Sequence, residues 1–294
     1  MSAATSQYER QVDQQESAAT PRLQRADGAA EIGFVRREGA AELCHLYQRT
    51  PCRVLFPRPE PGDLPVATLL TTSGGLTGGD RLRLAIRSEA GARAVVTTAA
   101  AEKIYRSRSG DVAVNVTLDV ASGGWLEWLP QETILFDRAR LVRRIEAHLT
   151  TDARLLAVEM LVFGRAAHGE RFAQGLLHEA WRIRVDGRLR WAEALRLEGD
   201  IARTLDAPAA FGGARAMATA ILVAPDAEQH LSLARELAAT GTARGSATLV
   251  NGVLLIRLLA ERAELVRTTL AHTVAALRHA VAGLPAAMPR LWAT

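Results

Sequence analysis

The feature that most constrains the fold is a long succession of strand-like segments, from about residue 30 to residue 200, with no helix-like segment between them. Residues 80–87 (DRLRLAIR) and 111–120 (DVAVNVTLDV) alternate polar and apolar side chains, which is the period of a strand with one buried face. Turn signals such as SGD at 109–111 and DG at 186–187 separate the strands. The pattern disfavours βαβ units and a doubly wound sheet, and leaves an all-β stack, sandwich or coil of strands.

The C-terminal third has a different character. Residues 225–239 carry apolar side chains at helical spacing, and Gly241 is the expected C-cap. Strand-like segments at 246–250 and 252–258 meet at Asn251-Gly252, a type I′ hairpin signal. A second helix is expected over about 260–282. Its apolar side is formed by Leu265, Leu270, Val274, Leu277 and Val281. We therefore predict a small α+β element of two helices and a hairpin.

No linker long enough to separate two domains is visible. We predict one domain over residues 31–294, with a β-rich body at 31–215 and the α+β element at 216–294. Residues 1–30 are polar and lack the apolar core of a secretory signal, which predicts a disordered tail on a cytoplasmic protein. The apolar runs are far shorter than the ~20 residues of a membrane span, so we expect no membrane partner.

The charge pattern gives little support for a nucleic-acid partner. The 36 basic residues include one lysine, Lys103, and the arginines are scattered along the chain, with a net charge of +4. Such scatter is typical of solvated faces and surface ion pairs. Aromatic residues make up only 5%, so stacking platforms for single strands are scarce. A nucleic-acid binder would be retained on heparin and released steeply by salt.

Cysteine and histidine do not form a strong metal motif. Cys44 and Cys52 are too few for a disulfide framework or a four-ligand zinc site. With His45 they could supply three ligands, but their apolar, strand-like surroundings favour buried thiols. His272 and His279 are seven residues apart and could share a helix face, although satisfied or solvent-facing histidines are the favoured interpretation.

The stretch TTSGGLTGGD, residues 71–80, is the most glycine-dense of the chain and could cradle a phosphate. Gly74 and Gly79 have the spacing of a phosphate loop, but Asp80-Arg81 stands where that loop needs lysine and a hydroxyl. The segment that follows alternates like a strand, so no helix N-terminus is available for an anion. The dinucleotide fingerprint and the G-x-S-x-G elbow are also missing. We interpret this stretch as a tight turn that presents Asp80.

Carboxylates in apolar strands are the remaining anomaly. Glu159 lies within LLAVEMLVF (155–163), Glu193 within WAEAL (191–195), and Glu102 precedes Lys103. A buried carboxylate is costly unless it is paired, hydrogen-bonded or metal-bound. Two interpretations stay open: an arginine partner for each glutamate, or a polar interior that passes or transiently holds a cation. A metal-dependent hydrolase using these carboxylates is the alternative function.

Five segments, taken in order, resemble the family of the urease accessory protein UreD, also called UreH. They are GGLTGGD (74–80), AEKIYRS (101–107), LEWLPQETILF (126–136), FGRAAHGERF (163–172) and MPRLWAT (288–294). Together they cover roughly residues 30 to 294. The motif residues, for which we expect structural roles, are Gly78, Gly79, Lys103, Tyr105, Arg106, Trp128, Pro130, Gln131, Gly164, Gly169 and Glu170.

The resemblance implies a mainly β fold in which strands coil into a helix-like stack, with a few helices near the C-terminus. It also implies a non-catalytic scaffold in urease maturation. Proteins of this family bind UreF, through it the GTPase UreG, and apo-urease, so that Ni²⁺ reaches the urease active site. The resemblance implies no tightly bound cofactor, only transient Ni²⁺. GTP hydrolysis would belong to UreG, in agreement with the missing phosphate loop.

Family members are thought to carry nickel through an internal tunnel, which would give the strand carboxylates a purpose. On this resemblance Asp80, Glu159 and Glu193 line the route, and Glu102 is a further candidate at a position that varies in the family. Relatives often carry Asp at the second of these positions. Replacement of the first three by Ala is expected to reduce urease activation without unfolding.

The C-terminal segment supplies the candidate partner contacts. Arg290 and Trp292 are residue types enriched at binding hot spots. Packing of Trp292 into the protein's own core is the alternative.

Overall fold

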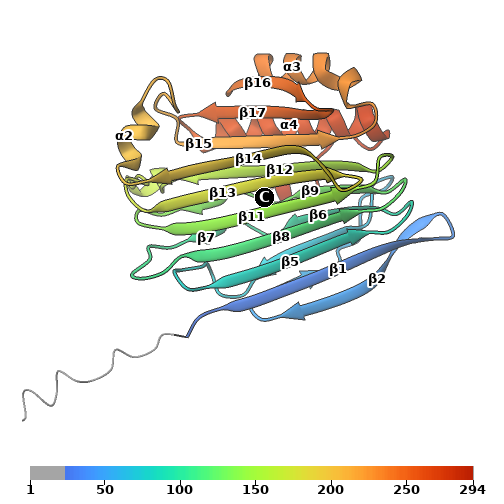
Figure 1. Cartoon of the computed structure of the whole chain (residues 1–294), viewed down its shortest axis with the longest axis horizontal. Helices are drawn as coiled ribbons and strands as arrows, with labels where there is room; N and C mark the ends of the chain where they lie inside the picture. The colour runs from blue at the N-terminus through green and yellow to red at the C-terminus, as the bar shows by residue number, and fades with distance from the viewer. Residues whose placement is uncertain (1–23, 294) are drawn as a thin grey trace, which may run out of the picture.

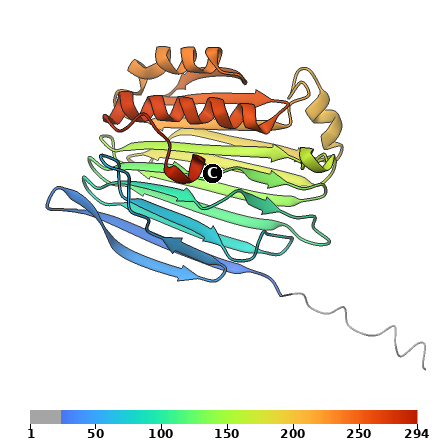
Figure 2. The same cartoon turned by 180° about the vertical axis from the view of Figure 1, so that it is seen from behind.

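The computed structural model describes residues 24–293, and two β-sheets form its body (Figures 1 and 2). Sheet A contains β1 (Asp27–Arg37), β2 (Ala40–Arg49), β5 (Arg81–Ser88), β8 (Val112–Val120), β11 (Arg140–Leu149), β13 (Leu176–Val185) and β14 (Arg188–Glu198). Sheet B contains β3 (Cys52–Leu55), β4 (Val66–Thr71), β6 (Arg93–Thr98), β7 (Glu102–Ile104), β9 (Trp125–Leu129), β10 (Thr133–Leu135), β12 (Arg154–Phe163), β15 (Ala216–Val223), β16 (Arg244–Val250) and β17 (Val253–Ala260).

The chain coils between the two sheets. Sheet A has the order β14-β13-β11-β8-β5-β1-β2, and sheet B runs β16-β17-β15-β12-β9-β6-β4-β3, with β7 and β10 beside it. Strands β1, β5, β8, β11 and β13 pair in parallel, as do β4, β6, β9 and β12. Parallel strands need a crossover, and each strand of one sheet supplies it for the other sheet. The predicted mainly β, coiled stack of strands is confirmed.

The main core lies between the sheets and follows from the sequence alternation. In β8 the valines and Leu118 point inward and are buried, while Asn115 and Asp119 face out. Sheet B is covered on both faces, because a second core lies on its outer side beneath the C-terminal helices. Strand β12 is therefore buried along nearly its whole length, which explains the continuous apolar run around Glu159.

The helices lie mostly in the C-terminal part, in agreement with the prediction. They are α2 (Ile201–Asp206), α3 (Leu231–Thr240), α4 (Ala263–Ala282) and the 3₁₀ turns η1 (Ala166–His168), η2 (Ala227–His230) and η3 (Arg290–Ala293). Figure 2 shows α4 lying across sheet B, with the C-terminal turn beside it. Leu270, Val274 and Leu277 of the predicted apolar side of α4 are fully buried, and Leu265 and Val281 are partly buried.

Two local predictions for the α+β element concern its hairpin and the end of its first helix. The Asn251-Gly252 hairpin is confirmed, with φ of 48° and 82° at its two central residues. The prediction that Gly241 is the C-cap of this helix is also confirmed, and its backbone there is extended, with a φ of −69°. An added Cβ there would lie 2.2 Å from Thr269 Cγ2, so this glycine lets the chain approach α4 closely.

The N-terminal boundary falls earlier than predicted. Strand β1 begins at Asp27, within the residues 1–30 predicted as a tail, because residues 27–30 pair with β5 and Ala29 and Ala30 also pair with β2. Residues 1–23 of that predicted tail lie outside the described residues. None of the helices in residues 24–293 has the length and hydrophobicity to span a bilayer.

Candidate cation-binding cavity

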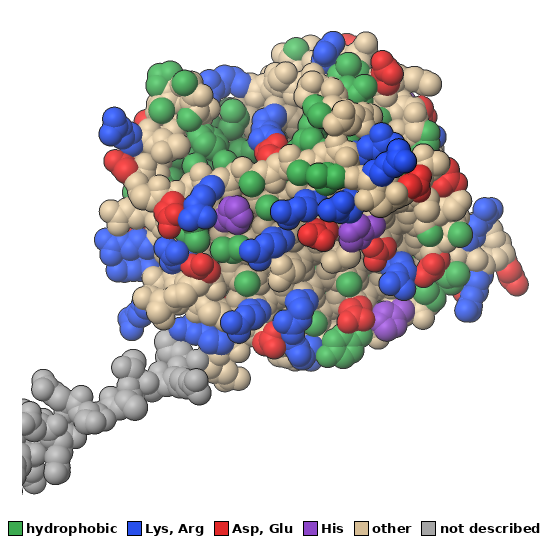
Figure 3. All heavy atoms as spheres, viewed as in Figure 1, with side chains coloured by type: hydrophobic (Ala, Val, Ile, Leu, Met, Phe, Trp, Pro, Cys, Tyr) green, Lys and Arg blue, Asp and Glu red, His purple; other side chains and the backbone are tan. Residues whose placement is uncertain are grey.

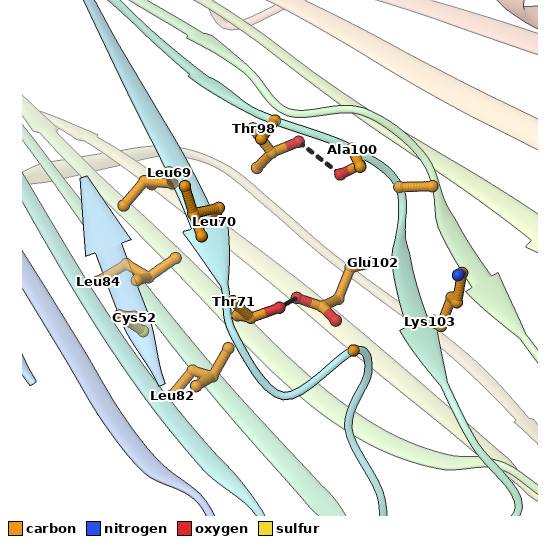
Figure 4. A pocket seen from close by; sticks show the side chains of 13 residues that line it. Cys52, Leu69, Leu70, Thr71, Leu82, Leu84, Thr98, Ala100, Glu102 and Lys103 are labelled. Carbon is orange, nitrogen blue, oxygen red and sulfur yellow. Dashed lines mark hydrogen bonds between the residues drawn. The ribbon is translucent and has the colours of Figure 1, made fainter. Parts of the chain in front are cut away.

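Two adjoining cavities lie between the sheets at the β4–β7 side of the stack. The first, of about 200 Å³, is bordered by Cys52, Thr71 and the segment 98–103 (Figure 4). The second, of about 70 Å³, lies deeper and reaches Arg143 and Glu159. Their shared walls are formed by Leu82, Leu84, Thr98 and Glu102. The two cavities therefore adjoin at a wall of two leucines that also carries the polar side chains of Thr98 and Glu102.

Glu102 stands at the junction of the two cavities. Its carboxylate accepts a hydrogen bond of 3.1 Å from Thr71 Oγ1, and in Figure 4 it points toward that residue. No basic side chain in residues 24–293 lies within 4.0 Å of its carboxylate oxygens. Burial raises the pKa of Glu102 above its usual value, although the Thr71 hydrogen bond opposes the shift. This carboxylate is the one most available to a cation.

Glu159 belongs to a buried ionic cluster at the inner end. Arg143 Nη2 lies 2.7 Å from Glu159 Oε2, and Arg143 Nε donates to Glu179 Oε2 at 2.7 Å. Trp128 Nε1 donates to Glu159 Oε1 at 3.2 Å, and Arg143 Nη1 donates to Thr133 Oγ1 at 2.9 Å. All three charged residues are less than 9% exposed. The arginine partner considered for Glu159 is therefore present.

The inner end nevertheless has three carboxylates around one guanidinium, and the second cation that borders the cavities, Lys103, is exposed. Glu102, Glu159 and Glu179 surround the single guanidinium of Arg143, which attracts all three. Desolvation is the main cause that raises the pKa of Glu159 to about 7. Arg143 lowers this pKa, and the negative charge of Glu179 raises it. An interior with this charge balance favours an additional cation or a proton.

The shifted pKa of Glu159 predicts a pH-dependent stability. The usual pKa is 4.5 and the folded value is about 7, so the folded state binds this proton more tightly. The stabilising contribution is complete below about pH 4.5 and is lost as the pH rises through about 7. We expect the free energy of unfolding of the wild type to fall by about 2–3 kcal/mol relative to Glu159→Gln over this range. Urea denaturation at several pH values measures the free energy of unfolding of both proteins. The same dependence of this free energy on pH in wild type and Glu159→Gln would contradict the prediction.

Sequence reasoning missed Arg143 and Glu179. In β11 the inward positions are otherwise apolar, and Arg143 interrupts the series between Leu141 and Ile145. Glu179 interrupts β13 in the same way, between Leu177 and Trp181. Charged residues at inward positions were the available signal.

Two of the predicted route residues lie away from the cavities. Asp80 is buried, and its oxygens accept hydrogen bonds from the amides of Ala26 (2.8 Å) and Thr77 (2.7 Å). Glu193 lies on β14, where both oxygens accept from Arg257 Nη2 at 2.7 and 2.6 Å. Neither residue lines the cavity that holds Glu102 and Glu159. The structure therefore gives Asp80 a turn-forming role and Glu193 the arginine partner that the sequence left open.

The glycine-rich stretch closes a turn against β7. The amide of Leu76 donates to Lys103 O at 2.8 Å, and the amide of Tyr105 donates to Leu76 O at 2.7 Å. A Cβ on Gly78 would lie 1.9 Å from Ser107 Oγ, so only glycine fits. Gly79 has a φ of 94°. The loop uses its amides within the protein, in agreement with the rejected phosphate loop.

The remaining family-motif residues lie in turns, at backbone contacts or along the cavity. Tyr105 Oη donates to Gly74 O at 2.7 Å, and Glu170 pairs with Arg165. Gly164 and Gly169 have positive φ. Arg106 forms an isolated bridge with Ala139, Pro130 lines the inner cavity beside Trp128, and the Lys103 side chain is exposed.

Trp292 is buried in the protein's own core. It is 5% exposed, its Nε1 donates to Leu129 O at 3.0 Å, and Arg267 lies over its ring. Gln131, in the wall of the inner cavity, donates to Leu291 O at 3.1 Å. The C-terminal turn thus seals the outer side of sheet B at the cavity. Trp292 therefore packs into the protein's own core, as the alternative interpretation predicted, and is not an exposed anchor. Arg290 is exposed and remains a candidate partner contact.

A second buried ionic cluster fixes α4 to sheet B. Arg278, fully buried, donates through Nε to Glu127 Oε2 at 2.8 Å and through Nη2 to Asp63 Oδ1 at 2.5 Å. Burial raises the pKa of Glu127 to about 7, although Arg278 lowers it. Trp125 Nε1 also donates to Glu127, at 2.9 Å. This cluster was not predicted from the sequence.

The cysteines and helix histidines form no joint site. Cys52 is buried as predicted, but the prediction for Cys44 is wrong, because it lies exposed on edge strand β2. Within the described part of the chain, no group of three or more His, Cys, Asp or Glu side chains has the arrangement of a metal site. His272 and His279 are exposed on α4.

The fold and the cavity define a class: a coiled β-stack protein whose interior carries an excess of carboxylates. Comparison with known proteins specifies it further. The family model described as UreD urease accessory protein matches residues 26–293. The chain therefore belongs to the UreD family of urease accessory proteins, and its role lies in urease maturation.

Individual relatives agree over most of the chain. A protein named Urease accessory protein UreD from Magnetococcus marinus is 43% identical over 274 residues, covering 92% of this chain and 94% of that protein. A protein of the same name from Granulibacter bethesdensis is 46% identical over 240 residues, covering 81% and 99%. The one from Brucella suis is 42% identical over 266 residues, covering 90% and 94%.

Proposed function

We propose that this protein is a non-catalytic scaffold that links apo-urease to an assembly of UreF and the GTPase UreG, and that Ni²⁺ passes through its interior on the way to urease. The observation that carries the proposal is the pair of adjoining cavities with Glu102 at their junction and Glu159 at the inner end. Family membership places this interior in a protein of urease maturation.

The chemistry of the interior suits a cation in transit. Carboxylate oxygens are weak, hard ligands, and a route needs ligands that release the ion onward. Glu102 has one hydroxyl partner and the cavity at its side, so its oxygens can exchange that bond for a metal ion. Arg143 limits the net negative charge around Glu159, which prevents a deep trap for the ion.

Protonation would couple the route to pH. The pKa of Glu159 is about 7, so a cation must displace a proton from this carboxyl group near neutral pH. Nickel transfer to urease would then become faster as the pH rises through 7.

Co-expression tests the scaffold role. The tagged protein is produced with the urease subunits and UreF, and the complexes are recovered on the tag. We expect both apo-urease and UreF to co-purify, and UreG to be recovered only when UreF is present. Recovery of the tagged protein without either partner would overturn the proposed function.

A further inference from the structure

Within residues 24–293, no element covers the end of the coil stack formed by β2 and β3. Strand β2 is the last strand of sheet A, and β3 is the last strand of sheet B. Figure 1 shows β1 and β2 at the end of the stack opposite α3. At that opposite end the Glu193–Arg257 ion pair joins β14 to β17. Stacked repeats normally need a polar cap at each end, and free strand edges are usually covered.

Exposed apolar side chains gather at the uncovered end. Of the six large apolar residues that are most exposed in residues 24–293, five lie here and one, Leu189, lies on β14. The five are Leu43, Leu46, Tyr47, Leu55 and Phe56, with exposures between 39% and 56%. Scattered exposed apolar residues are ordinary, but a cluster of them indicates a contact surface.

The register explains why two of these side chains, Leu43 and Leu46, lack cover, whereas Tyr47 pairs with the exposed Glu31 and Leu55 alternates with the buried Cys52 and Val54. Leu46 pairs with Ile32 and Leu43 pairs with Phe34, and both β1 residues are fully buried in the core. Paired residues of antiparallel strands project to the same side of a sheet. Leu43 and Leu46 therefore project to the core side of sheet A. They lie on β2, however, and the buried core already ends at the neighbouring strand β1.

The charges at this end favour an acidic partner. Arg53 and Arg58 flank Leu55-Phe56, both are exposed, and neither has an ion-pair partner among the described residues. Arg49 nearby is already paired with Asp27 at 2.9 Å. A second copy of this chain would bring the same unpaired arginines together, which like-charge repulsion disfavours. Carboxylates beside apolar side chains would complement the surface.

The uncovered end borders the outer cavity. Cys52, the first residue of β3, lines that cavity and pairs with Thr71, whose hydroxyl donates to Glu102. A protein seated on β2 and β3 would stand beside the carboxylate at the cavity junction.

We propose that the β2–β3 end, residues 40–58, is the docking surface for a partner protein that presents apolar side chains flanked by carboxylates, and that docking places this partner at the outer cavity. The inference rests on the proposed scaffold function, because the partner would be one of the urease maturation proteins. Two substitutions of exposed residues test it: Leu55→Ser/Phe56→Ser removes the apolar contact, and Arg53→Glu/Arg58→Glu reverses the charge. The matched control is Arg188→Glu/Leu189→Ser on β14, which changes the same residue types at the other end of the stack.

Affinities of the full-length wild type and the variants are measured separately for UreF and for apo-urease. We expect both β2–β3 variants to lose at least about tenfold in affinity for one of these two proteins, and the control to stay within about twofold, with thermal unfolding unchanged in all three. Unchanged affinity of both variants for both proteins would overturn the docking surface and leave the scaffold function intact. Wild type that binds neither protein would overturn both proposals. A wild type that dimerises, with monomeric β2–β3 variants, would reassign the surface to a second copy.

Discussion

Replacing both cavity glutamates, Glu102→Gln with Glu159→Gln, is expected to lower urease activation at least about tenfold in cells that co-express the urease operon. The glutamines keep the side-chain volume and can still accept the hydrogen bonds of Thr71 and Trp128. Only the negative charge is lost, and with it the attraction for Ni²⁺. Glu179 remains, but it is occupied by Arg143. The readouts are urease activity and the nickel content of the purified urease.

Glu193→Gln is the matched control for this prediction. It neutralises a strand carboxylate of the same type that is held by Arg257 outside the cavities. We expect full urease activation with this variant. If the double variant activates urease normally while Glu193→Gln does not, the route passes elsewhere. The thermal unfolding of the double variant, measured in parallel, separates a lost route from a lost fold.

Arg278→Met is expected to cause the largest loss of stability, about 3–5 kcal/mol in the free energy of unfolding. The substitution leaves the buried carboxylates Glu127 and Asp63 without their shared cation. It also removes the ionic link between α4 and these two carboxylates, while the apolar contacts of Leu270, Val274 and Leu277 remain. Urea denaturation at pH 7 measures the loss.

Two further variants make the Arg278 prediction specific. Arg262→Met removes an exposed ion pair with Glu264 near the start of α4, and we expect it to change stability by less than about 1 kcal/mol. Adding Glu127→Gln to Arg278→Met removes one of the uncompensated charges and is expected to recover part of the loss. Equal stability of Arg278→Met and wild type would show that the cluster contributes nothing to the fold.

The alternation of polar and apolar residues predicted most of the strands. In segments such as 111–120 this alternation arises because successive side chains of a strand point to opposite faces, which is a local property. The hairpin at Asn251-Gly252 was likewise a local signal. The C-cap at Gly241 was a local signal too, but its close approach to Thr269 was not, because sequence spacing does not contain that contact.

The site was less predictable than the fold, because partners meet across strands. Glu159 and Glu102 were selected for their apolar surroundings, and both line the cavity. Asp80 was selected in a conspicuous loop, and its carboxylate binds backbone amides. Arg143 contacts Glu159 only because β11 and β12 lie in facing sheets, a pairing that no short-range pattern encodes.

The position of α4 has a consequence for how the chain is made. This helix covers the outer face of sheet B and binds Asp63, 215 residues earlier in the sequence, yet it is synthesised only after the last strand of that sheet. Until then the coils already synthesised expose an apolar sheet face, and such surfaces attract chaperones and proteases or lead to aggregation. A product that terminates before residue 263 would carry every cavity residue and still lack the cover for this face, so the cell would degrade it rather than use it as a partial scaffold.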